Sequence, residues 1–269
     1  MDRYLAAVIQ VSSGADRAQN LATVRALVAD AAARGAALAV LPEVVAWRGP
    51  RDEEVAAVEP IPGPTSEAMA ALARDYRLVL CAGSWLEAGP TPERAYNTSC
   101  VFGPDGTLLA RYRKIHLFDV TLPGQVEVRE SATRAPGADV VVTDTPLGRL
   151  GLSVCYDLRF PELYRRLVRQ GAELLLVPSA FTFPTGAAHW EVLLRARAIE
   201  NQCWVLAANQ SGLSPYGFPD YGHSMIVDPW GVVVARAADG CGVVMAEIDR
   251  ERLRRVRREL PSLANARLS

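Results

Sequence analysis

The sequence predicts an α/β fold in which the β-sheets are covered by helices, and three observations lead to this fold class. Half of the 269 residues are hydrophobic, which is enough for a sizeable core. Short apolar runs alternate with segments of helical periodicity early in the chain. Pairs of strand-like runs around glycine-containing turns occur in both halves. No linker or low-complexity segment interrupts the pattern, so we expect one domain spanning residues 1–269.

The first half shows the clearest alternation. Residues 5–11 form an apolar run typical of a buried strand, and residues 16–34 have helical periodicity ending before Gly35. The motif Gly103-Pro104-Asp105-Gly106 predicts a hairpin turn. The other elements expected here are strands at 37–41, 78–85, 96–102 and 107–112 and a helix at 66–76.

The second half begins with residues 116–139, which lack periodicity and carry two Pro-Gly pairs. They predict a long loop, and long ordered loops are often functional. The elements expected after it are strands at 139–143, 149–154, 174–177, 204–208, 225–227, 232–235 and 243–248, and helices near 161–170, 187–201 and 249–258.

Charge and cysteine content exclude several functions. The formal net charge is −1 and the pI is about 6.3, which argues against nucleic-acid and anionic-membrane partners. The basic run 250–258 is interrupted by Glu251 and predicts a solvated helix face. No signal peptide or run of 18 apolar residues is present, so we expect a cytoplasmic protein. Five scattered cysteines without a CxxC pair predict no metal site and no disulfide framework, and we expect no cofactor.

Lysine usage singles out one residue. Of 29 basic residues only Lys114 is a lysine, and all the others are arginines. A surface amine tolerates that exchange, whereas a site that needs a compact point charge does not accept a planar guanidinium. Lys114 is therefore a candidate for chemistry, although composition alone is equally compatible with chance.

Three strand ends carry reactive side chains. Glu43 follows the apolar run 37–41, Lys114 follows the strand at 107–112, and Cys155 ends the strand at 149–154 before a turn into a helix. Such a turn exposes a nucleophile and lets the next backbone N–H face an oxyanion. Together they form a coherent set, in which Glu43 accepts the thiol proton and Lys114 stabilises thiolate and oxyanion.

Other interpretations remain open for each residue taken singly. Glu43 could be a surface or helix-capping carboxylate, and Cys155 could be a buried core cysteine. The polar residues Asp157 and Arg159 beside Cys155 favour the functional interpretation. A Cys–His pair is the alternative chemistry, with His116, His189 or His223 as the base.

Several sequence blocks resemble the nitrilase superfamily of carbon–nitrogen hydrolases. The resemblance covers residues 5–261 and rests on these blocks in this order: LPE at 41–43, YRKIHLFD at 112–119, GLSVCYDLRFPEL at 151–163, PSAFTFPTGAAHWEVLLRARAIENQ at 178–202 and YGHSMIVDPWG at 221–231. It implies a four-layer αββα sandwich, made of two mixed sheets covered by helices, and a homodimer or higher homo-oligomer.

The resemblance also assigns roles to residues. Glu43 corresponds to the general base, Lys114 to the cationic stabiliser and Cys155 to the nucleophile. Glu130, otherwise an ordinary loop carboxylate, corresponds to a second glutamate that holds the lysine. The backbone N–H of Tyr156 is expected to bind the oxyanion together with Lys114.

Within the superfamily, the stretches HLFDVTLPGQ and HWEVLLRARAIENQCWVLAANQ resemble the Nit branch, which comprises amidases of deaminated glutathione and omega-amidases. Arg159 and Thr182 resemble residues that hold the 2-oxo-acid end of the substrate, and arginine can bind a carboxylate with two hydrogen bonds. The resemblance implies a thiol-dependent amidase that cleaves a small 2-oxo-acid amide through a Cys155 thioester.

Three alternatives to this activity stay open: an omega-amidase acting on 2-oxoglutaramate, an N-carbamoyl amino acid hydrolase or nitrilase, and a non-catalytic scaffold with the same fold. The chain also departs from the branch. Val44 and Val45 follow LPE where an aromatic is usual, Val128 stands where an aromatic is common, and the ending 264–269 lacks the usual motif. These departures leave the proposed catalytic residues unchanged, but they affect which substrate and which dimer contact we expect.

Overall fold

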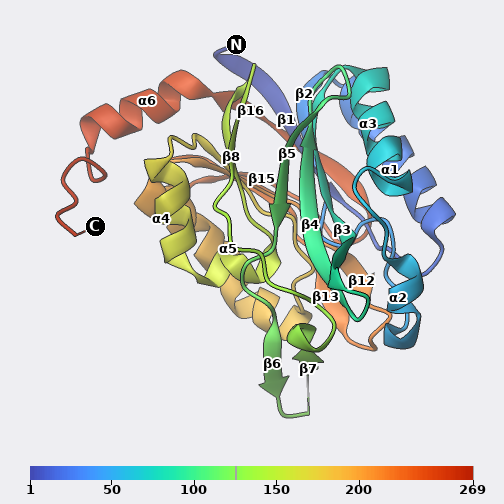
Figure 1. The fold of residues 1–269 in the computed structure, drawn as a ribbon. Coiled ribbons are helices and arrows are strands. Elements are labelled where there is room, and N and C mark those ends of the chain that lie inside the picture. Colours follow the sequence, from blue (N-terminus) through green and yellow to red (C-terminus); the bar gives the residue numbers. More distant parts are fainter. Residues whose placement is uncertain (125, 269) are drawn as a thin grey trace.

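The computed structural model describes residues 1–124 and 126–268. Gln125, in the predicted long loop, and Ser269, in the divergent ending, lie outside the described residues. The chain forms two six-stranded mixed sheets that face each other, with helices on both outer sides (Figure 1). The predicted αββα sandwich is therefore confirmed.

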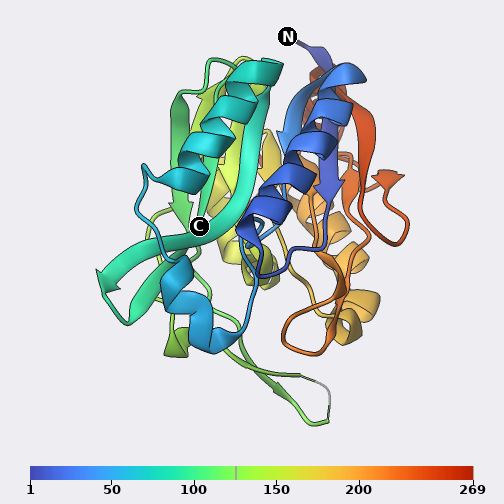
Figure 2. The same ribbon diagram turned by 90° about the vertical axis from the view of Figure 1, so that its right-hand side faces the viewer.

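The first sheet has the order β16-β1-β2-β3-β4-β5. Its three central strands β1, β2 and β3 are parallel, and the outer strands are antiparallel. Helices α1 and α3 lie side by side on its outer face (Figure 2). The bounds are β1 Arg3–Gln10, α1 Arg17–Ala33, β2 Ala36–Val40, α3 Pro64–Tyr76, β3 Val79–Thr91, β4 Arg94–Phe102, β5 Leu108–Arg113 and β16 Gly242–Asp249.

The second sheet has the order β15-β14-β11-β10-β9-β8, with β9, β10 and β11 parallel. Helices α4 and α5 pack on its outer face. The bounds are β8 Val142–Thr145, β9 Gly148–Leu152, α4 Pro161–Arg169, β10 Leu174–Leu176, α5 Phe183–Asn201, β11 Trp204–Ala207, β14 Met225–Val227 and β15 Val233–Arg236, and the C-terminal helix α6 runs over Arg250–Glu259.

Strand periodicity explains how the layers form. In β1, Ala6 and Val8 face the second sheet, whereas Ala7 and Ile9 pack under the helices. Successive side chains of a strand point to opposite faces, so one apolar strand supplies both interfaces. The helix α1 begins after Asp16, whose carboxylate accepts the Gln19 N–H at 3.0 Å.

The main difference from the predicted elements concerns residues 116–139. This segment holds a hairpin of β6 (Asp119–Leu122) and β7 (Val126–Arg129), which projects below the two sheets, followed by the 3₁₀ helix η2 (Glu130–Ala132). The hairpin strands are short and only half-buried, so they lack the apolar signal of a core strand.

Smaller elements also differ from expectation. The strand predicted at 139–143 lies at Val142–Thr145, because a tight turn pairs Thr145 with Gly148. Helix α5 begins four residues earlier than predicted, with Pro184 in its first turn. The sequence did not predict η1 (Arg51–Glu53), α2 (Glu54–Ala57) or the pair β12 (Ser211–Leu213) and β13 (Pro219–Tyr221). No helix in the described part of the chain has the length and apolar character needed to cross a bilayer.

Candidate active site

Glu43 lies three residues beyond β2, at the edge where the parallel strands of both sheets end. This edge is where α/β folds bind ligands. Its side chain is nearly buried, and the Ala180 N–H donates to Oε2 at 3.0 Å while Asn97 Nδ2 donates to Oε1 at 2.8 Å. Backbone and side-chain donors thus fix the Glu43 carboxylate in one orientation.

The Lys114 ammonium lies between two carboxylates. Its Nζ donates to Glu43 Oε1 at 2.9 Å and to Glu130 Oε2 at 2.8 Å, and only 2% of the side chain is exposed. The backbone of Lys114 is held as well, because its N–H donates to the Asn97 carbonyl at 2.9 Å. The structure therefore brings Glu43, Lys114 and Glu130 into one cluster.

The charges of this cluster are mutually stabilised. Burial lowers the pKa of Lys114, but the carboxylates of Glu130 and Glu43 outweigh it and hold that pKa well above its usual value. Burial also raises the pKa of Glu130, yet Lys114 and the Phe118 N–H, which donates to Oε2 at 2.6 Å, bring it below the ordinary value. Lys114 is thus charged, and Glu130 ionised, at neutral pH.

Cys155 sits at a sharp turn between β9 and the 3₁₀ helix η3 (Cys155–Arg159). Its φ of +49° lies in the left-handed region that non-glycine residues avoid. Its N–H donates to the Pro178 carbonyl at 2.8 Å. The predicted strand-to-helix turn is present, and the strained backbone at the nucleophile position is typical of a nucleophile elbow.

The surroundings of Cys155 raise the pKa of its thiol above the ordinary value. Burial raises its pKa most, the negative charge of Glu43 raises it further, and Lys114 opposes both without prevailing. A cysteine in this setting needs a base to remove its proton as it reacts. Glu43 lies in position to be that base, so the arrangement favours base-assisted attack over a preformed thiolate.

Asp157 links the turn at Cys155 to β5, the strand that ends just before Lys114. This fully buried carboxylate accepts the Val154 N–H at 2.9 Å and the Tyr112 hydroxyl at 2.6 Å. It also accepts the His116 N–H at 3.0 Å and lies 2.7 Å from His116 Nδ1. His116 is thereby engaged beside Asp157, which disfavours it as the base for Cys155.

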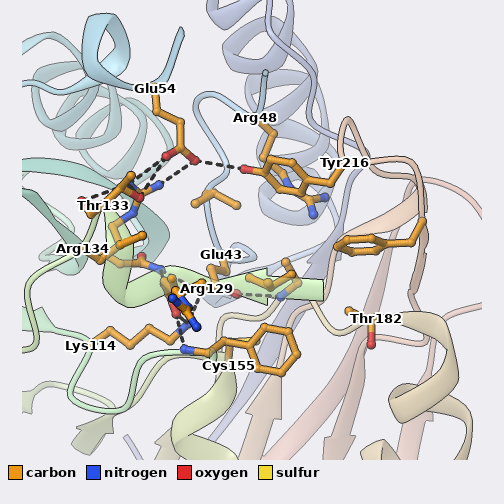
Figure 3. Close-up of a pocket in the computed structure, with 18 residues that line it drawn as sticks. Glu43, Arg48, Glu54, Lys114, Arg129, Thr133, Arg134, Cys155, Thr182 and Tyr216 are labelled. Atoms are coloured by element: carbon orange, nitrogen blue, oxygen red, sulfur yellow. Dashed lines mark hydrogen bonds and ion pairs between the residues drawn. The ribbon is translucent and has the colours of Figure 1, made fainter. Parts of the chain in front are cut away.

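A cavity of about 130 Å³ opens over the cluster (Figure 3). Figure 3 shows Glu54, Arg48 and Tyr216 toward one side of this cavity and Lys114 and Cys155 toward the other. Its lining comes from both sheets, the β6–β7 hairpin and the loops around α2 and β12–β13. A small molecule in the cavity would therefore contact the thiol and the Lys114 cluster together.

A smaller recess adjoins the cavity at Cys155. Arg159 and Thr182, both predicted from the sequence, line it together with the Tyr156 side chain. The Arg159 guanidinium lies 5.3 Å from the Phe181 ring centre and 5.9 Å from that of Tyr156. The recess thus combines aromatic walls with a cation. Tyr156 also lies in the first turn of η3, where a backbone N–H has no partner within the helix.

The structure adds residues that sequence reasoning missed. Asn97 Nδ2 contacts both carboxylates, at 2.8 Å from Glu43 and 3.3 Å from Glu130. Thr185 lines the recess and lies 2.9 Å from Thr182, hydroxyl to hydroxyl. An asparagine inside the apolar run 96–102 was a usable signal, whereas Thr185 carried none.

The described residues form neither a metal-binding cluster nor a disulfide. Within residues 1–124 and 126–268, no group of three or more His, Cys, Asp or Glu side chains is arranged to hold a metal ion. All five cysteines are free, and of these only Cys241 is exposed.

Comparison with known proteins agrees with this geometry. A family model described as carbon–nitrogen hydrolase matches residues 5–258. Deaminated glutathione amidase of Homo sapiens is 47% identical over 269 residues, covering 98% of this chain and 82% of that protein. Omega-amidase NIT2 of Homo sapiens is 38% identical over 263 residues, covering 97% and 94%.

A solved structure has a similar fold over nearly the whole chain. The crystal structure of the C. elegans NitFhit protein matches with a TM-score of 0.92 and 39% identity, covering 99% of this chain and 66% of that longer one. The family match spans nearly the whole chain, and the resemblance to the nitrilase superfamily is confirmed. The chain belongs to the carbon–nitrogen hydrolase family.

Proposed function

We propose that the protein is a thiol-dependent amidase that hydrolyses the amide of a small 2-oxo acid, of the deaminated glutathione type. The observation that carries the proposal is the buried Glu43–Lys114–Glu130 cluster beside Cys155 at the floor of a cavity. The similarity to deaminated glutathione amidases supports the substrate class. Arg159 and Thr182 in the adjoining recess would bind the 2-oxo-acid carboxylate.

The reaction would begin with proton transfer from the Cys155 thiol to Glu43 as the sulfur attacks the amide carbon. The carbonyl oxygen becomes an oxyanion between the Lys114 ammonium and the Tyr156 N–H. Glu43 then gives its proton to the departing amine as the C–N bond breaks, which leaves a thioester on Cys155. Water, deprotonated by Glu43, attacks the thioester and releases the acid and the Cys155 thiol.

Lys114 must keep its proton throughout this cycle. The two carboxylates hold its pKa well above the usual value, so it acts as a fixed positive charge and not as an acid. Glu130, which lies 2.8 Å from Nζ, makes the largest contribution to this increase and positions the ammonium. An arginine could not occupy the same small volume with the same three donors.

A substrate screen tests the proposal. Purified protein is incubated with deaminated glutathione, 2-oxoglutaramate, N-carbamoyl amino acids and nitriles, and the released amine or ammonia is measured, with Cys155→Ala as the blank. We expect kcat/KM to be highest for deaminated glutathione. A preference for 2-oxoglutaramate would make the protein an omega-amidase, and preference for the other two classes would refute the substrate assignment. No turnover of any substrate would favour the scaffold interpretation.

We also propose that residues 1–269 act as one domain and that the chain forms a homodimer or higher homo-oligomer. Val192 and Ile199 of α5 and Trp230 are at least half exposed. Gly231, next to Trp230, lies against Ile199, so these apolar residues share one surface. A second copy of the chain would cover them. Light scattering of the wild type and of Ile199→Glu tests this, with a shift to monomer expected for the variant.

We further propose that the protein works in the cytoplasm. Its five cysteines are all free, as is usual in a reducing compartment. Fractionation of cells that express the protein tests this, and recovery in a secreted or membrane fraction would contradict it.

A further inference from the structure

The cations that line the cavity differ in whether a carboxylate is paired with them. Among the described residues, Lys114 is paired with Glu43 and Glu130, Arg48 with Asp220, and Arg134 with Glu54. These pairs are buried, so each positive charge is already neutralised within the protein. Such pairs shape the cavity but leave no free charge for a ligand.

Arg129 is the exception in this lining. It ends β7 at the mouth of the cavity, is exposed, and has no carboxylate within ion-pair distance among residues 1–124 and 126–268. Its cross-strand neighbour is Asp119, but both oxygens of that carboxylate bind Ser131, at 2.9 Å to N and 2.6 Å to Oγ. Asp119 interacts with Arg129 electrostatically, but the Arg129 guanidinium makes no hydrogen bond to a described residue, so its donors remain available.

Arg159 is a second cation without a carboxylate partner in the described chain. The Arg159 guanidinium contacts His189, with 3.2 Å between Nη1 and Nδ1. Arg159 lines the small recess, whereas Arg129 lines the large cavity. The two spaces share Phe118, Cys155, Ala180 and Thr182, so they meet at the thiol. Two arginines without an ion-pair contact to a described carboxylate thus line the two spaces that meet at Cys155, Arg129 in the cavity and Arg159 in the recess.

An anionic substrate needs a cation to bind near Cys155, because the Glu43–Lys114–Glu130 cluster is negatively charged. Glu43 and Glu130 together carry one more negative charge than Lys114 neutralises. A substrate carboxylate that approaches Cys155 is repelled by this excess unless a cation binds it. Arg159 can serve the acyl end, and only the large cavity has room for a substantial group on the amide nitrogen.

We propose that Arg129 is a specificity-determining residue that binds the carboxylate on the leaving amine of such an anionic substrate. This inference rests on the proposed function, because it assigns the acyl end to the Arg159 recess. Val44, Val128 and Phe218 line the cavity near Arg129 and would contact the apolar part of the amine. A dipeptide with a free C-terminus has this chemistry.

The experiment compares two ligands that differ by one charge. One is the amide of 2-oxoglutarate with alanylglycine, and the other is the same compound with a C-terminal carboxamide. Binding of both is measured by calorimetry in the Cys155→Ala background, where no turnover occurs, and hydrolysis of both is measured in the otherwise wild-type protein. Each measurement is repeated with Arg129→Ala, Arg129→Lys and Arg94→Ala.

We expect the acid to bind about tenfold more tightly than the carboxamide when Arg129 is present, since a hydrogen-bonded charge is lost otherwise. The ratio should fall to near one in Arg129→Ala and be partly kept in Arg129→Lys, which retains the charge but not the fork. Arg94 is an exposed arginine outside the cavity, and Arg94→Ala should keep the full ratio.

The inference is wrong if the acid and the carboxamide bind equally in the presence of Arg129, or if Arg129→Ala weakens both by the same factor. The latter result would mean that Arg129 only positions its neighbour Glu130. Failure of the proposed function has a different signature: an Arg129-dependent preference for the acid in binding, with no hydrolysis of either compound by the wild type.

Discussion

The Lys114 ammonium lies 2.9 Å from the Glu43 carboxylate, although 71 positions separate the two residues in the chain. Glu43 follows β2 and Lys114 follows β5 of the first sheet, whereas Cys155 follows β9 of the second sheet. The face-to-face packing of the sheets therefore assembles the site, and its chemistry depends on short contacts between buried charges.

Lys114→Arg should abolish most activity although it keeps the charge. A guanidinium is larger and planar, so it cannot contact Glu43, Glu130 and an oxyanion from one point. We expect kcat to fall by roughly 100- to 1000-fold, the usual effect of losing an oxyanion donor. Steady-state kinetics check this, with Arg94→Lys as the matched reverse exchange at an exposed site. Near-normal turnover would make the single lysine an accident of composition.

Cys155→Ala should fold normally and release no amine from any amide. Selective alkylation offers a second measurement, but the exposed Cys241 would react as well. The labelling therefore uses the Cys241→Ser protein, in which the other three cysteines are buried. Mass spectrometry should find iodoacetamide on Cys155 first, and residual amidase activity in Cys155→Ala would end the nucleophile assignment.

The alkylation rate of Cys155 should rise with pH without reaching a plateau near neutrality. Because burial and Glu43 raise the pKa of this thiol, its thiolate fraction is small at neutral pH and still rising at the ordinary cysteine value of 9.0. The rate in the Cys241→Ser protein should thus keep increasing between about pH 7 and pH 9. A plateau below pH 8 would show that the resting residue is a thiolate.

Glu130→Gln should destabilise the protein at neutral pH and less so in acid. The folded-state pKa of Glu130 lies below its ordinary value of 4.5, so its ionised form stabilises the fold above pH 4.5. This contribution declines as the pH falls through the lower folded-state pKa. Urea denaturation from pH 7 to pH 3 should show the wild-type advantage shrinking below about pH 4.5. A difference that is independent of pH would contradict the ionised pair.

Asp157→Asn should lower both stability and kcat. The amide NH2 lies either opposite the Val154 N–H and the Tyr112 hydroxyl, which share Oδ2, or opposite the His116 N–H at Oδ1, and one unsatisfied buried donor costs about 1–3 kcal/mol. We expect kcat to fall more than KM rises, because the turn that carries Cys155 shifts. Asp144→Asn is the control, since its ion pair with Arg149 is exposed and screened by solvent and therefore contributes little to stability. A stability loss with unchanged kcat would leave Asp157 a purely structural role.

Local sequence patterns predicted an α/β fold with covered sheets and the candidate residues Glu43, Lys114 and Cys155, whereas the four-layer arrangement was implied by the resemblance to the nitrilase superfamily. Apolar runs such as 37–41 have the length and pattern of buried strands, and Glu43, Lys114 and Cys155 each follow one. These signals are local, because periodicity and strand ends depend on neighbouring residues. The family blocks then assigned roles to these positions.

Several features of the site arise only when distant segments pack together in the tertiary structure. The hairpin β6–β7, the two contacts of Asn97 and the buried carboxylate of Asp157 depend on pairings between distant segments. The raised pKa of Cys155 also depends on burial and on Glu43, 112 positions earlier in the sequence. Local pattern cannot encode such effects, because an electrostatic environment exists only once the chain has packed.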